Sequence, residues 1–166
     1  MENLLVPRNL EGRKEKLKQI NIKLLSQEVI DGDISLDEFF MDIDPKFVKL
    51  KNVNGNVILS GEHWTEIPEW LKNVEIGGSF RCYNNKLTTL KNCPRKIGGS
   101  FYCAFNKLSS LEGCPETIEG NFWCDNNQLI SLEGCPENIG GDFWCYVNKV
   151  KLELPDYVKL KGEFTN

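Results

Sequence analysis

Seven cysteines are the residues of this 166-residue chain whose side chains could do the most chemistry. Two cysteines about two to four residues apart are typical of a zinc site, and a thiol with a lowered pKa is a nucleophile. Here the gaps between successive cysteines alternate between 11 and 10 residues. The residues are Cys82, Cys93, Cys103, Cys114, Cys124, Cys135 and Cys145. Because this spacing contains no close pair, it predicts no metal site and indicates an internal repeat.

The chain offers few other groups for catalysis. His63 is the only histidine, and the sequence contains no phosphate-cradling glycine loop and no serine–histidine–aspartate set. Residues 31–39 resemble the second half of a calcium-binding EF-hand loop, but Gln27 and Val29 stand where carboxylates belong. We therefore predict a protein that is not an enzyme and that holds no metal and no cofactor.

A 21-residue repeat organises most of the chain. Residues 76–159 hold four copies of the frame I-x-G-x-F-x-C-x-x-N-x-L-x-x-L-x-x-C-P, and the fourth copy departs from it after Asn148. Two degenerate copies of 23 residues fill residues 30–75, and residues 160–166 restart the frame as a terminal strand. With the N-terminal segment of residues 1–29, these copies are expected to form one solenoid domain.

Each repeat must fold as part of a stack. The phenylalanine and the first cysteine of the frame are two residues apart, so on a strand both side chains point to the same face. One repeat cannot bury that face alone, whereas parallel strands from successive repeats can. Gly77 and Gly78, before the first phenylalanine, are expected to form a tight bend with positive φ. The frame asparagines are expected to form an inward ladder that bonds backbone groups at the corner: Asn85, Asn106, Asn127 and Asn148.

The N-terminal segment, residues 1–29, is predicted to form a helix. Its apolar residues recur at helical spacing: Leu10, Leu17, Ile20 and Leu24. Asn9 is a suitable N-cap. Because the open end of a solenoid core needs a polar-faced cover, we expect this helix to be a cap. A detachable helix that binds a partner is the alternative.

Aromatic side chains dominate the outward positions of the predicted strands. The residue between the phenylalanine and the cysteine must point away from the core, as must the residue after the cysteine. These positions include Arg81, Tyr83, Tyr102, Trp123, Asp125, Trp144 and Tyr146. Exposed apolar clusters mark interaction sites, and tryptophan, tyrosine and arginine are common at binding hot spots. We therefore predict a partner-binding face; the alternative is that the aromatic rings only stack and stiffen the sheet.

Composition and charge exclude several classes of protein. The net charge is −4, and residues 30–75 carry ten acidic and four basic residues. No basic stripe runs along the chain, so nucleic acid is not the expected partner. No apolar run exceeds five residues, whereas a membrane helix needs about 20. Because no secretory signal is visible, we expect a cytoplasmic protein with reduced cysteines.

The frame resembles a known repeat family. Residues 80–87 read FRCYNNKL where the leucine-rich repeat has L-x-L-x-x-N-x-L, and Cys93-Pro94 resembles the Leu-Pro of its short bacterial type. Residues 132–136, LEGCP, are similar to segments of small repeat proteins encoded by large tailed bacteriophages. The resemblance implies a mostly β leucine-rich-repeat solenoid with one parallel strand per repeat and an N-terminal helical cap.

The same resemblance implies a function. It suggests a non-catalytic protein–protein interaction module, and specifically a bacteriophage protein that binds and inhibits a host defence or regulatory protein in the bacterial cytoplasm. The residues themselves leave two alternatives open. The aromatic face could serve self-association in a structural protein, or it could bind a small ligand or nucleic acid by aromatic stacking.

Overall fold

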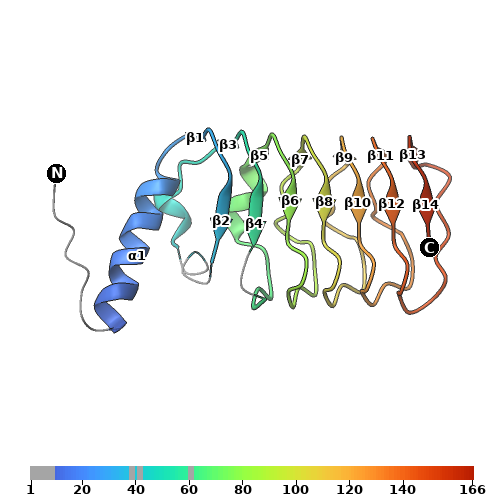
Figure 1. Cartoon of the computed structure of the whole chain (residues 1–166), viewed down its shortest axis with the longest axis horizontal. Coiled ribbons are helices and arrows are strands. Elements are labelled where there is room, and N and C mark those ends of the chain that lie inside the picture. The colour runs from blue at the N-terminus through green and yellow to red at the C-terminus, as the bar shows by residue number, and fades with distance from the viewer. Residues whose placement is uncertain (1–9, 38–39, 41–42, 60–61) are drawn as a thin grey trace.

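The computed structural model describes residues 10–37, 40, 43–59 and 62–166, and it is a parallel β-solenoid with an α-helix at its N-terminal end (Figure 1). Successive turns follow one another along the long axis, from β1 beside the helix to β13 and β14 at the other end (Figure 1). The predicted solenoid with one parallel strand per repeat and an N-terminal helix is confirmed.

The strands that begin at the frame phenylalanine position, where β2 and β4 have isoleucine and valine instead, form one seven-stranded parallel sheet. They are β2 (Ile34–Leu36), β4 (Val57–Leu59), β6 (Phe80–Arg81), β8 (Phe101–Tyr102), β10 (Phe122–Trp123), β12 (Phe143–Trp144) and β14 (Phe164–Thr165). Each strand pairs in register with the equivalent residues of the next turn, so that Phe122 lies between Phe101 and Phe143. The offset between partners is 23 residues up to β6 and 21 residues from there on.

A second seven-stranded parallel sheet accompanies the first. Its strands are β1 (Val29–Ile30), β3 (Asn52–Val53), β5 (Glu75–Ile76), β7 (Lys96–Ile97), β9 (Thr117–Ile118), β11 (Asn138–Ile139) and β13 (Lys159–Leu160). In the regular copies they contain the frame isoleucine and the residue before it. The sequence did not predict this ladder, because two-residue strands are too short to show an alternating pattern.

The core is a set of stacked columns. The phenylalanines of β6, β8, β10 and β12 have ring centroids 5.6, 5.5 and 4.8 Å apart from one turn to the next. Trp64 occupies the place of the first frame leucine in the second degenerate copy. Its backbone N–H donates to Asn85 as that of Leu87 donates to Asn106. One continuous apolar cluster therefore includes residues from Leu25 to Leu152.

The predicted asparagine ladder is confirmed. Asn106 Oδ1 accepts a hydrogen bond from the backbone N–H of Leu87 at 2.9 Å. Its Nδ2 donates to the carbonyls of Cys82 in the previous turn and Cys103 in its own turn, at 2.9 and 3.1 Å. Equivalent bonds are made by Asn85, Asn127 and Asn148. Each asparagine thus ties two turns together and satisfies backbone groups that would otherwise be buried without partners.

A second polar ladder runs along the position before the phenylalanine. There a side-chain oxygen accepts a hydrogen bond from the backbone N–H of the equivalent residue in the next turn, at 2.7 to 3.0 Å. The acceptors are Asp33, Asn56, Ser79, Ser100, Asn121 and Asp142. All six are short side chains that carry an oxygen acceptor, which is the common requirement of this position.

The glycine pairs serve close approach between turns, not positive φ as predicted. A Cβ atom on Gly78 would lie 2.7 Å from the carbonyl carbon of Gly55, and one on Gly99 would lie 2.8 Å from that of Gly78. Positive φ occurs at two other glycines of the described chain, Gly113 and Gly134. The backbones of adjacent turns pack so closely before the phenylalanine strands that no side chain fits there.

Helix α1 (Leu10–Leu25) joins the solenoid through its C-terminal turn. Leu25 is buried and its carbonyl accepts hydrogen bonds from the backbone N–H groups of Lys49 and Leu50, at 2.8 and 3.2 Å. Of the apolar residues at helical spacing, Leu17 and Ile20 lie outside the core, because they are 37% and 49% exposed. The helix extends away from the first turn, so only its end reaches the core (Figure 1). The predicted cap residue, Asn9, lies outside the described residues.

None of the described residues forms a helix with the length and apolar character that a bilayer crossing requires.

Candidate functional site

The outward residues of four neighbouring strands form a continuous stack. Tyr102 on β8 and Trp123 on β10 have ring centroids 4.3 Å apart and planes within 8° of parallel. Trp144 on β12 continues the stack 4.4 Å from Trp123, at 12°. Arg81 on β6 lies at the other end, with its Cζ 5.6 Å from the centroid of Tyr102. Both faces of the Trp123 ring are therefore covered, and the stack presents ring edges to the solvent.

A groove of about 390 Å³ lies beside this stack. We call it the aromatic groove, and its lining consists of Arg81, Tyr83, Tyr102, Ala104, Phe105, Trp123, Asp125 and Tyr146. The next outward column holds Tyr83, Ala104, Asp125 and Tyr146 on four successive turns. Its two ends are exposed tyrosines, while the two turns between them carry short side chains. The groove exists because alanine and aspartate leave space where the flanking turns have phenol rings.

The structure brings the predicted binding residues together. Six of the seven line the aromatic groove, and the seventh, Trp144, extends the stack at its edge. Asp125 is the exception in exposure: it was expected on the open face, but its side chain is only 2% exposed. Phe105 also lines the groove, although the repeat frame did not predict an outward position for it.

The carboxylate of Asp125 has one oxygen without a partner. Its Oδ2 accepts a hydrogen bond from Asn126 Nδ2 at 2.8 Å. Its Oδ1 is buried and has no hydrogen-bond partner among the described residues. No ion pair found in the described part of the chain involves Asp125. A buried carboxylate oxygen without a partner destabilises the folded chain, so Asp125 Oδ1 is a candidate for contact with a ligand.

The cysteines are packing residues in this structure. All seven are free thiols, which confirms the prediction that they form no disulfides. Burial raises the pKa of the Cys145 thiol to about 12, and burial also raises the pKa of Cys82, Cys103 and Cys124 in the same column. A thiol with a raised pKa is protonated at neutral pH and is a poor nucleophile.

The acidic residues before β2 belong to the inter-turn contacts. Asp31 Oδ1 accepts a hydrogen bond from Asn54 Nδ2 at 2.8 Å, and Asp33 Oδ1 accepts one from the backbone N–H of Asn56 at 2.7 Å. Over the residues that the structure describes, no three histidine, cysteine or acidic side chains gather in a way that could hold a metal ion.

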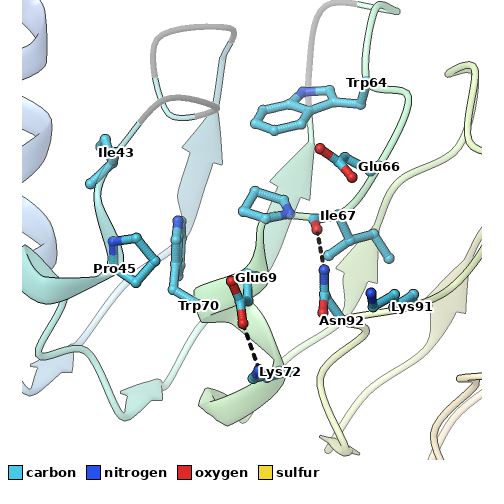
Figure 2. A pocket seen from close by; sticks show the side chains of 11 residues that line it. Ile43, Pro45, Trp64, Glu66, Ile67, Glu69, Trp70, Lys72, Lys91 and Asn92 are labelled. Carbon is cyan, nitrogen blue, oxygen red and sulfur yellow. Dashed lines mark hydrogen bonds and ion pairs between the residues drawn. The ribbon is translucent and has the colours of Figure 1, made fainter.

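A larger cavity, of about 570 Å³, lies at the corner of the degenerate turns (Figure 2). We call it the corner cavity, and it is lined by Ile43, Pro45, Trp64, Glu66, Ile67, Pro68, Glu69, Trp70, Lys72, Lys91 and Asn92. It adjoins two 3₁₀ helices, η2 (Pro45–Phe47) and η3 (Glu69–Asn73). Apart from the loss of the regular frame in residues 30–75, no pattern in the sequence predicted this cavity.

Several polar groups of the corner cavity bond one another. Lys72 Nζ lies 2.9 Å from Glu69 Oε1, and Asn92 Nδ2 donates to the carbonyl of Ile67 at 3.1 Å (Figure 2). The indole N–H of Trp70, beside Pro45, has no acceptor among the described residues (Figure 2). The cavity therefore offers a ligand fewer free groups than its size suggests.

No protein-family model, no curated protein and no solved structure matches this chain. A function has to be inferred from the surface itself. The aromatic groove is a better candidate for a binding site than the corner cavity, because it combines exposed aromatic side chains with a carboxylate that has an unpartnered oxygen.

Proposed function

We propose that this chain is a non-catalytic binding module that holds a protein partner against the sheet face of β6, β8, β10 and β12. The observation that carries the proposal is the aromatic groove, which places exposed tyrosines beside a fixed stack of Arg81, Tyr102 and two tryptophans. Such side chains are typical of binding hot spots. Because the two polar ladders hold the strands in register, little conformational freedom is left to lose on binding.

A protein partner is favoured over a single-stranded nucleic acid. Bases bind by stacking on a free aromatic face, but both faces of Trp123 are covered by neighbours at 4.3 and 4.4 Å. The groove also contains the carboxylate of Asp125, which repels phosphate. The ring edges and tyrosine hydroxyls instead suit the mixed apolar and polar surface of a protein.

The repeat frame also supports a proposal about the family of the protein and the compartment in which it acts. We propose that the solenoid is a leucine-rich-repeat module of the short bacterial type and that it acts in the bacterial cytoplasm. On the resemblance to repeat proteins of large tailed phages, its partner would be a host protein of defence or regulation, which the module would inhibit by occupying it. These steps rest on the repeat frame alone.

Affinity capture from a bacterial lysate tests the proposal when the wild-type chain is compared with two variants. Trp123→Ala combined with Trp144→Ala removes half of the stack, while Phe47→Ala removes an exposed aromatic ring from η2, away from the groove. We expect a protein that is retained by the wild type and by Phe47→Ala but not by the double variant. Equal retention by all three would contradict the proposal.

Light scattering tests whether the partner is a second copy of this chain. A dimer that forms with rising concentration and is absent in the double variant would assign the aromatic face to self-association instead.

A further inference from the structure

Asp125 gives the aromatic groove a chemical preference. Asp125 lines a hollow with aromatic walls, and its Oδ1 is a buried carboxylate oxygen that has no hydrogen-bond partner in the described part of the chain. Aromatic rings attract cations through their faces and tolerate the apolar stem of a long side chain. A cation that reached Oδ1 would supply the missing partner and neutralise a buried charge.

We propose that the aromatic groove takes a lysine side chain of the protein partner, with its ammonium group bound to Asp125 Oδ1. The inference rests on the proposed function, and it specifies which chemical group of the partner the face recognises.

The geometry favours lysine over arginine. Oδ2 already accepts a hydrogen bond from Asn126 Nδ2 at 2.8 Å, so a guanidinium that bonded both oxygens would have to share Oδ2 with Asn126, whereas an ammonium needs only Oδ1. One free oxygen suits a compact ammonium. Asp125 is also deeply set, at 2% exposure, so the ligand needs a slender stem that can pass between larger side chains.

The groove has a floor and walls that fit such a stem. Ala104 lies one turn from Asp125 and leaves the floor open, while Tyr83 and Tyr146 stand at the two ends of the column. Both tyrosines and Phe105 are exposed, so their rings have room to change rotamer as the ammonium approaches the buried oxygen. No rearrangement of the backbone is required.

The cationic residue that lines the groove does not bond the carboxylate of Asp125. Arg81 also lines the groove, but its guanidinium lies over Tyr102, and no ion pair joins it to Asp125. The rung between them carries Tyr102 and Ala104. The charge of Asp125 is thus left for a group from outside the chain.

An NMR titration with small probes tests the inference without knowledge of the partner. The probes are N-acetyl-lysine methylamide, its ε-acetylated form, which has the same stem without the charge, and N-acetyl-arginine methylamide. We expect the lysine probe to shift the amide signals of Phe105 and Asn126 saturably, with a dissociation constant in the millimolar range, about tenfold or more tighter than the ε-acetylated probe. The arginine probe should bind more weakly than lysine.

Variants assign the effect to the carboxylate. Asp125→Asn keeps an acceptor for Asn126 but removes the charge, and it should weaken lysine binding by about tenfold or more. Ala104→Leu fills the floor without changing any charge and should also abolish binding. Glu112→Gln removes an exposed carboxylate from the return segment and should leave binding unchanged. The amide spectrum of each variant shows whether it is folded.

Three results would overturn the inference. They are the absence of saturable shifts up to about 100 mM lysine probe at constant ionic strength, equal binding of the ε-acetylated probe, and wild-type affinity in both Asp125→Asn and Ala104→Leu. A chain dimer that depends on Asp125 would assign the groove to a lysine of a second copy and overturn the assignment to a separate partner. If capture of a partner still depends on Trp123 and Trp144 while the lysine probe fails, only this inference falls.

Discussion

A single asparagine in each turn shows how much one residue contributes to this fold. Asn106 bonds the backbone N–H of Leu87 and the carbonyls of Cys82, Cys103 and Ala104. All of these groups lie at a buried corner, where water cannot replace a lost partner. The sequence predicted this role, because an amide both donates and accepts and recurs at a fixed place in the frame.

Replacing that asparagine should be among the most destabilising changes available. We expect Asn106→Ala to lower the free energy of unfolding by about 2–4 kcal/mol, since it leaves several buried backbone groups unbonded. Lys107→Ala, at the exposed neighbouring position, should change it by less than about 0.5 kcal/mol. Urea unfolding of the two variants measures both values, and similar losses in both would contradict the ladder.

Buried thiols predict how stability depends on pH. The Cys145 thiol has a pKa of about 12 in the folded chain because of burial, against an ordinary value of 9.0. Between these values the folded state binds more protons than the unfolded state, so stability is complete below about pH 9 and falls as the pH rises toward 12. The other strand-column thiols act in the same direction, because burial raises their pKa too.

The midpoint of urea unfolding should therefore fall steadily between about pH 9 and pH 10.5. Cys145→Ala should be less stable than the wild type at pH 8, because it leaves a cavity, but its midpoint should depend less on pH. A wild-type midpoint that stays constant or rises over this range would contradict buried, protonated thiols.

The turn that follows each strand is the element where this chain stores strain. The residue before each ladder asparagine has positive φ: Asn84 at 55°, Phe105 at 54°, Asn126 at 52° and Val147 at 51°. Asparagine adopts this conformation readily, whereas a β-branched residue does so at a cost. Val147 is exposed, so its side chain gains little from packing in return.

Val147→Asn should consequently stabilise the protein. We expect an increase of about 1 kcal/mol in the free energy of unfolding, since two other turns already carry asparagine at this place. Val150→Asn, an exposed valine outside the positive-φ positions, serves as the matched control and should bring no gain. A stability gain in the control, or a loss in Val147→Asn, would refute the strain at this turn.

Particular elements also show which features the sequence can predict. The phenylalanine strands follow from the frame, because an alternating pattern repeated at 21 residues fixes both face and register. The need for glycine at position 78 does not follow from the frame, because it arises from the close approach of Gly55, which lies 23 positions earlier in the chain. The spacing of Leu17 and Ile20 predicted a helix, yet only the tertiary structure shows that this helix meets the solenoid at its last turn.

The sequence predicted which residues lie on the aromatic face, but it did not predict the groove in that face. Alternation placed Arg81, Tyr102 and Trp123 on the outer side of the sheet, where the structure stacks them. The groove depends on differences between turns, since Ala104 and Asp125 are short where Tyr83 and Tyr146 are long. A repeat frame describes what turns share, so it does not show a hollow that arises where they differ.

At the scale of the whole molecule, the solenoid is a stiff support for one patterned face. Two parallel sheets and the ladder before the phenylalanine connect every turn to the next, and the asparagine ladder joins the turns from the second degenerate copy onward (Figure 1). Acidic residues concentrate in the first turns, and the aromatic groove lies on the regular repeats beyond them. The acidic residues of the first turns thus lie apart from the aromatic surface of the regular repeats.

The central claim is that this aromatic surface binds a protein, and the dissociation constant of the captured partner tests it most directly. We expect Trp123→Ala with Trp144→Ala to weaken binding at least about thirtyfold, because two central aromatic side chains are lost. The double variant should keep the circular dichroism spectrum of the wild type, and Phe47→Ala should bind as the wild type does. A folded double variant whose dissociation constant equals that of the wild-type chain would contradict the account.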